Sequence, residues 1–238
     1  KLVNTKGSIG IQELMQLFDA SESTIRRDLT ELHKNNSVIK VHGGAISNHS
    51  EKTITSDSNV PERENTNKNE KLLIAQYASK LISFNDMIYL DAGTTTYLLI
   101  DYLPKDLNLT FVTNGIMHAK KLAAYGHKVF IPGGLYKSTT EAVVGEEAIL
   151  TLSKYHFTKG FFGTNAINTH NGFTTPDMSE AMIKKSALHQ CFERYILSDS
   201  SKFDLVSYIS FGDFFDSKII TTNTIPENYH QYDNIIIV

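Results

Sequence analysis

Residues 91–96 carry the residue types of a phosphate-binding turn. The segment holds an aspartate, a glycine and three consecutive threonines between an apolar run at 87–90 and a helical pattern that starts near Tyr97. Such a turn supplies backbone N–H groups, hydroxyl donors and a helix N-terminus, which together can hold a phosphate. A helix capped in the ordinary way, with threonines in its first turn, explains the same residues equally well.

Four further polar or glycine-containing turns follow other apolar runs, at 113–115, 133–134, 163–165 and 199–202. In an open α/β sheet, ligands bind beyond the carboxyl ends of the strands. Five such turns at five strand ends favour a small polar ligand that carries a phosphate. The residues that we expect to bind it are Asp91, Gly93, Thr94, Thr95, Thr96, Asn114, Gly133, Gly134, Glu141, Gly163, Lys184, Asp199 and Lys202.

Lysines at two of these positions are the expected cationic partners of the phosphate. Lys202 is the stronger candidate, because it closes a strand-end loop. Lys184 follows Glu180 at a spacing of i, i+4, so the two side chains could instead form a helix ion pair worth roughly a few tenths of a kcal/mol. Both roles of Lys184 remain open at this point.

A second set of polar side chains belongs to a helix near the N-terminus. Residues 11–18 form a short amphipathic helix and residues 19–21 a turn, in which Ser21 is the expected N-cap of the next helix. Ile25, Leu29 and Leu32 share one face of that helix. The opposite face carries Ser23, Arg27, Thr30 and Lys34. Serine, arginine, threonine and lysine side chains suit the base edges and phosphates of a DNA major groove.

An ordinary surface helix would show the same periodicity, so the segment after it carries weight. Residues 38–45 are a β-type run that ends in a glycine pair. A hairpin beside a recognition helix forms a wing, whose basic residues can lie along the DNA backbone. The expected DNA-binding residues are Ser21, Ser23, Thr24, Arg26, Arg27, Thr30, Lys34, Lys40, His42 and Gly43.

The elements that must position these residues fall into three zones. We expect a winged helix-turn-helix at 1–46, a polar linker at 47–70 and a ligand-sensing domain at 71–238. The far end of the linker could run into a helix, which the charged residues at 62–64 and 70–71 could support. The third zone alternates helical patterns with mostly continuous apolar runs, which are typical of strands buried on both faces. The runs lie at 87–90, 109–112, 128–131, 160–163, 194–197, 218–220 and 234–238. We predict an α/β fold with one doubly wound, mostly parallel sheet.

Composition excludes several classes of protein. A net charge of −3 argues against non-specific wrapping of DNA, but it is compatible with a small DNA-binding module on a larger acidic domain. No apolar stretch of about 18 residues occurs, so we expect no membrane span. The single cysteine, Cys191, excludes a disulfide framework and a multi-cysteine zinc site; we expect a core thiol on a helix, a cytoplasmic location, and neither metal nor cofactor.

Residues 23–29 together with 42–45 resemble the signature of the DeoR family of bacterial sugar regulators, and the turns described above resemble that family's effector domain. The resemblance implies a winged helix-turn-helix, repressor activity, a sugar-phosphate effector and an effector domain similar in fold to ribose-5-phosphate isomerase and glucosamine-6-phosphate isomerase. Residues 140–146 and 162–166 further resemble phosphotransferase-system sugar repressors of Gram-positive bacteria.

Two features depart from the family pattern. The family's first helix begins further upstream, whereas only residues 2–4 of its end are present here; either the chain is truncated or this helix is short. The run 218–220 is followed by Thr221, Thr222 and Asn223, at a turn where the family commonly has an acidic residue.

Two functions fit these observations. The first is a repressor of a sugar-utilisation operon that a phosphorylated sugar releases from double-stranded operator DNA, with no catalytic residues. The second is an isomerase-like enzyme with an N-terminal docking module, in which Glu141 or Glu180 serves as general base. The wing favours the first, and an activator would share its chemistry. Paired half-sites predict a homodimer or tetramer.

Overall fold

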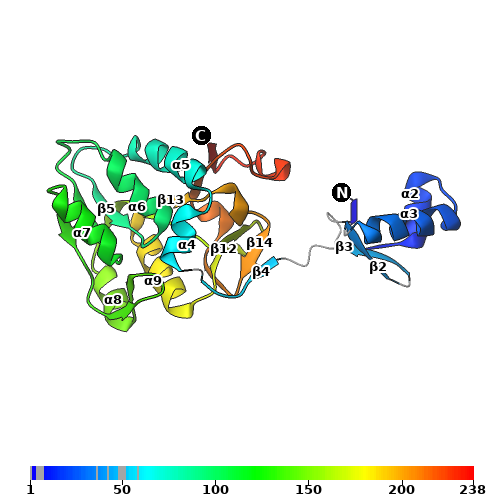
Figure 1. Cartoon of the computed structure of the whole chain (residues 1–238), viewed down its shortest axis with the longest axis horizontal. Helices are drawn as coiled ribbons and strands as arrows, with labels where there is room; N and C mark the ends of the chain where they lie inside the picture. The colour runs from blue at the N-terminus through cyan, green and yellow to red at the C-terminus, as the bar shows by residue number, and fades with distance from the viewer. Residues whose placement is uncertain (1, 4–7, 36, 42, 48–51, 58) are drawn as a thin grey trace. The chain divides into compact units, whose positions relative to one another are not determined.

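The computed structural model describes the chain except residues 1, 4–7, 36, 42, 48–51 and 58, and it divides into two compact units (Figure 1). Unit 1 comprises residues 1–52 and unit 2 residues 53–238. Each is described by itself. Of the helices in the described residues, none is long and apolar enough to cross a membrane.

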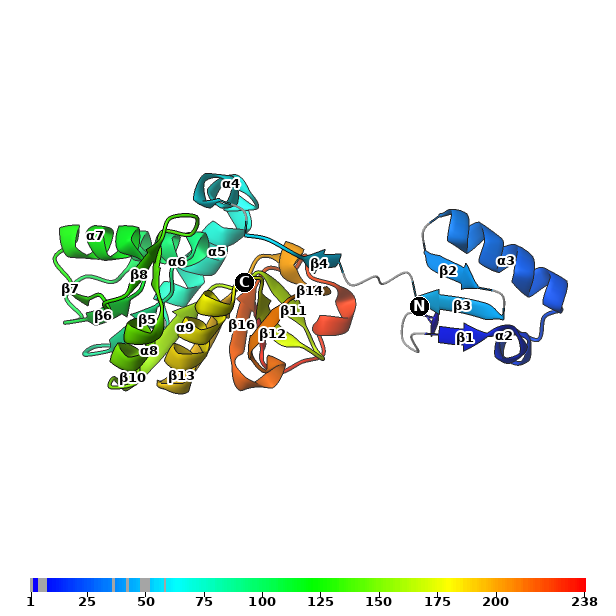
Figure 2. The same ribbon diagram turned by 90° about the horizontal axis from the view of Figure 1, so that it is seen from below.

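Unit 1 is a pair of helices beside a small antiparallel sheet. Helix α2 spans Ile11–Phe18 and helix α3 spans Glu22–Lys34, and strands β1 (Ser8–Gly10), β3 (Gly44–Ser47) and β2 (Val38–Val41) pair in that order. Strands β2 and β3 form the expected hairpin directly after α3 (Figure 2). This arrangement is the predicted winged helix-turn-helix.

The core of unit 1 comes from apolar residues at helical spacing. Ile25 and Leu29 of α3 pack with Ile11 and Leu14 of α2, as the periodicity predicts. Leu32 was expected on the same face, but its side chain is 41% exposed. It lies at the last turn of the helix, beyond the reach of α2. Val3, Ile9, Val38 and Ala45 complete the core.

Unit 2 is built on a seven-stranded sheet, and each of the seven apolar runs supplies one strand. The order is β17-β16-β13-β10-β5-β6-β7, and every neighbouring pair is parallel. The chain runs outward from β5 to β7 and then returns to β10 on the other side of β5, so the sheet is doubly wound. The strands are β5 (Met87–Leu90), β6 (Thr110–Thr113), β7 (Lys128–Phe130), β10 (Phe157–Phe162), β13 (Cys191–Leu197), β16 (Lys218–Thr221) and β17 (Ile235–Ile237).

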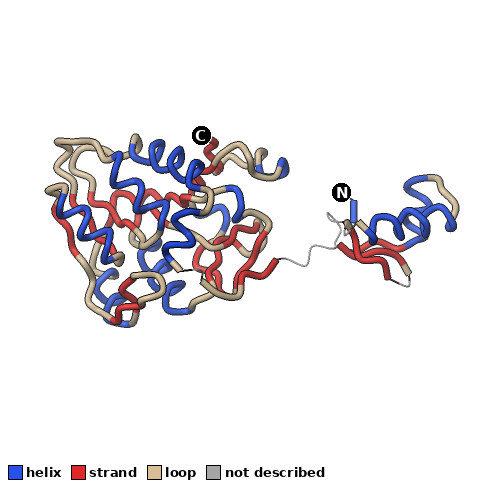
Figure 3. The backbone as a smooth tube through the Cα atoms, viewed as in Figure 1, coloured by secondary structure: helices blue, strands red, loops and turns tan. Residues whose placement is uncertain are grey.

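Helices cover both faces of this sheet, and alternate residues of each strand enter separate cores. Leu90 of β5 faces α5 (Lys68–Ser79), α6 (Thr94–Leu99) and α7 (Ile116–Ala124), whereas Tyr89 faces α8 (Glu146–Leu152) and α9 (Met178–His189). Figure 3 shows the helices around the strands. Burial on both faces explains why the strands are continuous apolar runs.

Short strands add small sheets that the apolar pattern did not predict. A three-stranded antiparallel sheet joins β11 (Ala166–Asn168), β12 (Gly172–Thr175) and β15 (Ile209–Gly212), and two pairs join β14 (Leu205–Ser207) to β4 (Lys52–Ile54) and β8 (Leu135–Lys137) to β9 (Ala142–Val144). Segments of three or four residues are too short to show a clear period.

Two predictions about local structure are corrected. The linker predicted at 47–70 contains β4, helix α4 (Val60–Asn65) and the first turn of α5. Helix α4 has no buried residue, so its composition is as polar as that of a linker. Cys191 was expected on a helix, but α9 ends at His189 and Cys191 begins β13. It is a buried thiol, and burial raises its pKa to about 12.

Candidate functional site

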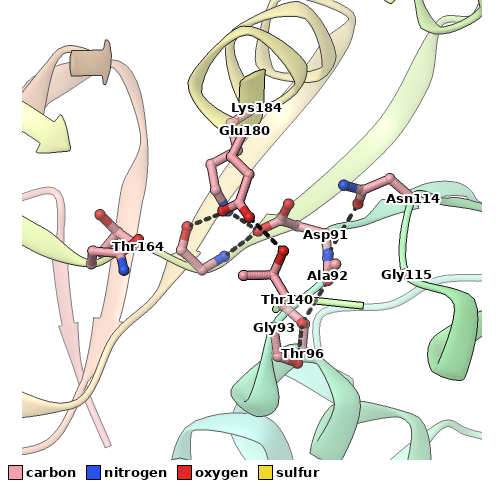
Figure 4. A network of polar contacts seen from close by, with 12 residues as sticks. Asp91, Ala92, Gly93, Thr96, Asn114, Gly115, Thr140, Thr164, Glu180 and Lys184 are labelled. Carbon is pink, nitrogen blue, oxygen red and sulfur yellow. Dashed lines mark hydrogen bonds and ion pairs between the residues drawn. The ribbon is translucent and has the colours of Figure 1, made fainter. Parts of the chain in front are cut away.

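The turn at 91–96 lies at the carboxyl ends of the neighbouring parallel strands β5 and β10. At this point the chain switches from adding strands on one side of β5 to adding them on the other. Asp91 is buried and forms an ion pair with Lys184 of α9 (Figure 4). Its Oδ2 also accepts the backbone N–H of Gly163, 3.0 Å away, and Lys184 Nζ donates to the Gly163 carbonyl. Two of the five predicted turns therefore meet helix α9 at one point. Lys184 pairs with Asp91 and not with Glu180, the i, i+4 alternative.

Buried polar side chains support this turn from beneath. Asn114 Oδ1 accepts the Ala92 N–H and the Tyr89 hydroxyl, each at 3.0 Å. Thr96 Oγ1 donates to the Asp91 and Gly93 carbonyls. Asn114 and Thr96 were predicted as ligand-binding residues, but the structure places both in the support of the turn and neither among the residues that line the cavity described below.

His118 of α7 completes this support, and sequence reasoning did not single it out. Its Nε2 lies 3.0 Å from the Gly93 carbonyl oxygen and 3.1 Å from Thr96 Oγ1. Burial lowers the pKa of His118 to about 4, so the ring is neutral at neutral pH. A histidine in a helical pattern looks the same in the sequence whether it faces a cavity or supports a turn. The sequence therefore gave no indication that His118 supports the turn at 91–96.

A cavity opens above the turn at the carboxyl edge of the sheet. Seven of the predicted ligand-binding residues line it, namely Gly93, Thr94, Thr95, Gly163, Lys184, Asp199 and Lys202. The cavity is lined by Arg63, Thr66, Lys71, Ala92, Gly93, Thr94, Thr95, Gly163, Thr164, Asn165, Glu180, Lys184, Leu197, Ser198, Asp199 and Lys202. Residues from α4, α5, α9 and three strand-end loops thus surround one space.

Sequence reasoning missed two cations of this wall, Lys71 and Arg63, because both precede the first strand of the large sheet, which begins at Met87. Lys71 is 4% exposed, and its Nζ donates to Thr94 Oγ1 at 3.1 Å and to the Arg63 carbonyl. Burial lowers the pKa of Lys71, an effect that the charge of Asp199 partly opposes. Lys71 lies on the buried face of α5, whereas the nearby Leu73 is 51% exposed. The order of apolar residues in this helix therefore gave no indication that Lys71 faces the cavity.

A second hollow adjoins the first and shares Arg63, Gly93 and Thr94 with it. Its wall differs in chemistry, since it adds two carboxylates and the rings of Tyr97 and His118. The remaining lining residues are Val60, Pro61, Glu64, Met117, Thr140 and Glu141. Glu141 was predicted as a ligand-binding residue and lies here, in the left-handed backbone region at φ 54°.

Glu180, one of the cavity's acidic residues, is held by side chains around it. Its Oε1 accepts a hydrogen bond from Thr140 Oγ1 and another from Lys137 Nζ, 2.9 Å away. Lys137 also pairs with Asp57, at 3.1 Å, and with Asp177, at 3.2 Å. Burial alone would lower the pKa of Lys137, but the hydrogen bond and charge of Glu180, together with Asp57, raise it.

The turn after β16 receives its acidic group from another part of the chain. Glu70 of α5 accepts hydrogen bonds from the Thr222 hydroxyl, at 2.6 Å, and from the backbone N–H and hydroxyl of Ser200. The loop that carries Asp199 and Lys202 is thereby fixed to α5. Asn67 adds a hydrogen bond of 2.7 Å to Asp199 Oδ1.

Gly133 and Gly134 were predicted as ligand-binding residues, but neither is among the residues that line the two hollows. Gly134 has a φ of +150°, and a Cβ atom there would lie 2.5 Å from the Val144 carbonyl oxygen. The glycine is required by the close approach of β8 to β9. Backbone geometry therefore explains Gly134 without a ligand, whereas a Cβ atom at Gly133 would meet only Glu147, at 3.8 Å.

In unit 1, the predicted DNA-binding residues cluster along α3. Ser21 caps the helix by accepting the Thr24 N–H at 3.3 Å, and its hydroxyl lies 2.9 Å from those of Ser23 and Thr24. Arg27 projects into solvent with 78% of its side chain exposed. Lys34 is exposed as well, so α3 presents a polar, donor-rich outer face.

The wing is attached to this helix by a lysine. Lys40 of β2 donates from Nζ to Thr30 Oγ1 at 2.6 Å and to the Arg26 carbonyl at 3.3 Å. Arg26 itself pairs with Glu22 at 2.7 Å. Lys40 and Thr30 therefore fix the wing against α3 in this structure. Gly43 is exposed at the tip of the hairpin, and His42 lies outside the described residues.

Two curated transcriptional regulators and one solved structure are similar to this chain. The "Uncharacterized HTH-type transcriptional regulator FruR" of Bacillus subtilis (strain 168) is 39% identical over 97% of this chain and 90% of its own length. The "Lactose phosphotransferase system repressor" of Streptococcus mutans is 34% identical over 89% of this chain and 84% of its own length. Among solved structures, a ribose 5-phosphate isomerase A from Methanocaldococcus jannaschii aligns with 58% of this chain and 55% of its own, at 18% identity and a TM-score of 0.44.

Family descriptions match both units. The description "DeoR-like helix-turn-helix domain" matches residues 1–51, and "DeoR C terminal sensor domain" matches residues 66–224. Together with relatives that are more than 30% identical over most of their length, these matches confirm the resemblance expected from residues 23–29 and 42–45. The chain belongs to the DeoR family of DNA-binding transcriptional regulators.

Proposed function

We propose that this regulator represses a sugar-utilisation operon and that a phosphorylated sugar, bound in the cavity above residues 91–96, lowers its affinity for operator DNA. The observation that carries the proposal is the charge of the cavity wall. Four cations line it, and carboxylates neutralise only part of their charge.

The balance of charge follows from the contacts. Lys184 is paired with Asp91, and Glu180 is paired with Lys137, so these groups offer little net charge to a ligand. Arg63, Lys71 and Lys202 remain, against the single carboxylate of Asp199. A phosphate supplies the missing negative charge, and charge-assisted hydrogen bonds to it are about twice as strong as neutral ones.

The second hollow suits the sugar rather than the phosphate. Glu64 and Glu141 are carboxylates that repel an anion, but they accept hydrogen bonds from hydroxyl groups. Tyr97 and Met117 add an apolar wall of the kind that packs against a sugar ring. A ligand that spans the shared residues Gly93 and Thr94 would therefore place its phosphate beside Lys71 and its hydroxyls beside Glu141.

An isomerase function receives less support. A general base must be free to take a proton from carbon. Glu180 already accepts two hydrogen bonds, one of them from a lysine, which favours a carboxylate committed to its partners. The named relatives are transcriptional regulators.

The repressor function also requires that α3 bind DNA as one half of a symmetric pair, so we propose a homo-oligomer that binds two half-sites of operator DNA. The effector need only bind the DNA-free arrangement more tightly than the DNA-bound one, because linkage then lowers DNA affinity by the same factor.

The decisive test is a thermal-shift screen with a panel of sugar phosphates. A true effector stabilises the folded protein by mass action, by about 2.7 kcal/mol at 100 times its Kd. Lys202→Met should lose that shift, whereas Lys154→Met, an exposed lysine that lines neither hollow, should keep it. Absence of a shift with every sugar phosphate would contradict the proposal.

The DNA side is tested with Arg27→Ala. Because Arg27 is a largely exposed cation on the outer face of α3, its loss should abolish retardation of duplexes selected from a random library, without changing the thermal shift given by the effector. A wild-type protein that selects no sequence at moderate salt would rule out operator binding.

A further inference from the structure

Helix α4 and the residues beside it form a strap across the candidate site. We define the strap as residues 59–67; it opens with Asn59, whose side chain caps α4, and ends at Asn67. The strap belongs to unit 2, although the chain enters it soon after the end of unit 1 at Lys52. No residue of α4 is buried, so apolar packing contributes little to holding it in place.

Polar contacts hold the strap at both ends. Just before the strap, Asp57 pairs with Lys137 and accepts a hydrogen bond of 2.8 Å from Asn165. At its end, Asn67 donates to Asp199. In the middle, Lys71 donates to the main-chain carbonyl of Arg63. Asn165, Lys71 and Asp199 all line the cavity, so each of these contacts also touches the site.

Arg63 is the side chain that the strap directs toward both hollows, since it lines each of them. Its Nε is buried and has no hydrogen-bond partner among the residues that the structure describes. A buried donor without an acceptor costs roughly 1–3 kcal/mol, so Arg63 is poised for an acceptor that is not part of the protein. Lys71 beside it is a buried cation whose described partners are both neutral oxygens.

We propose that Arg63 binds the phosphate of the effector together with Lys71 and Thr94, and that this contact fastens the strap to the sensing domain. The inference rests on the proposed phosphate site and adds a residue and a consequence to it. One anion that contacts Arg63 and Thr94 joins α4 directly to α6. Effector binding therefore reduces opening of the chain segment that leads from the DNA-binding unit.

The test uses the full chain and inorganic phosphate as the probe. Phosphate affinity is measured by calorimetric titration, and amide hydrogen exchange is followed in peptides that cover 59–67 and 91–97. The variants are Arg63→Gln, the conservative Arg63→Lys, and Lys68→Gln as a charge-matched control. Lys68 is exposed, close to the strap in the chain, and lines neither hollow.

In the wild type, phosphate should slow exchange in both peptides. Arg63→Gln should weaken phosphate binding by at least about tenfold, the factor for one charged hydrogen bond, and should remove protection of 59–67. Arg63→Lys should recover part of the affinity, and Lys68→Gln should behave as the wild type.

Two results would overturn the inference in different ways. Equal phosphate affinity in the wild type and Arg63→Gln, with 91–97 protected and 59–67 unprotected, would remove Arg63 from the site and leave the phosphate site intact. Failure of the wild type to bind phosphate at all would remove the phosphate site and the role of Arg63 together.

Discussion

Asp91 and Lys184 form an ion pair in which the two side chains are 2% and 6% exposed. Such a pair is retained only when both charges are matched and hydrogen bonded, because each ion pays a large desolvation penalty. Here Gly163 supplies a donor to one partner and an acceptor to the other. The pair therefore fixes the β5 turn to the β10 turn and forms the floor of the cavity.

Removal of one partner should be far more harmful than removal of both. Asp91→Ala leaves the Lys184 ammonium buried without its counter-charge, and we expect a loss of roughly 3–5 kcal/mol in the free energy of unfolding. The double variant Asp91→Ala with Lys184→Met should recover part of that loss in urea denaturation. A single variant as stable as the wild type would show that the pair does not hold the floor.

His118 gives the sensing domain a dependence on pH. Its folded pKa, about 4, lies below the ordinary value of 6.5, so the unfolded chain binds the extra proton first. The contribution of neutral His118 to the free energy of unfolding is fully present above pH 6.5. It is lost progressively as the pH falls toward 4, and the total loss is about 3 kcal/mol at most.

The measurement is urea denaturation between pH 7 and pH 4 for the wild type and His118→Gln. The wild type should lose more stability than the variant over this interval. Parallel curves would show that His118 does not titrate as its burial implies.

At the scale of elements, the sequence predicts the sheet better than the site. Mostly continuous apolar runs identify all seven strands because most positions in them are buried on one face of the sheet or the other. The strap is predicted only in part: the charged residues at 62–64 allow a helix, but α4 buries nothing, so its composition is that of a linker and gives no sign of its contacts with the site. Glu70 escapes because its partners Ser200 and Thr222 lie 130 and 152 residues away in the chain. Lys71 escapes because its partners, Arg63 and Thr94, lie outside its own helix, and periodicity within one helix cannot report them.

The wing offers a test of one such element. Gly44 lies where β3 pairs with β1, and a Cβ atom there would overlap the Ile9 carbonyl oxygen. A Cβ atom at Gly43 would meet nothing within 4 Å. Gly44→Ala should separate β1 from β3 at a cost of about 1–3 kcal/mol, a large share of the stability of so small a unit.

Differential scanning calorimetry of the full chain should show the effect of Gly44→Ala in the transition of unit 1. Gly43→Ala is the matched control and should melt as the wild type does. Equal melting of the two variants would mean that β1 does not pack as described.

For the whole molecule, the two units differ in the source of their stability. Unit 1 has one core of eight buried apolar residues, and unit 2 has two larger cores on either face of its sheet. Unit 1 also has nearly balanced charge, with seven basic and six acidic residues in 1–52. Binding to DNA must then depend on where the cations of α3 are placed rather than on net charge.

Residues 53–238 should therefore fold and sense the effector without unit 1. The fragment should give the same thermal shift with the effector as the full chain, within error, and should retard no DNA. Loss of the shift in a folded fragment would show that unit 1 contributes to the cavity.

The wall of the cavity also determines when during synthesis a chain can respond to its ligand. Its parts come from residues 63–71, 93–95, 163–165, 184 and 199–202, and the β5–β10 pairing joins residues about seventy positions apart. Contacts of such long range form slowly and only after the last participating segment has left the ribosome. Unit 1 is complete well before then. A premature stop codon anywhere between unit 1 and Lys202 would consequently yield a product that retains the DNA-binding sequence but lacks a finished sensor, and such alleles are expected not to respond to the effector proposed above.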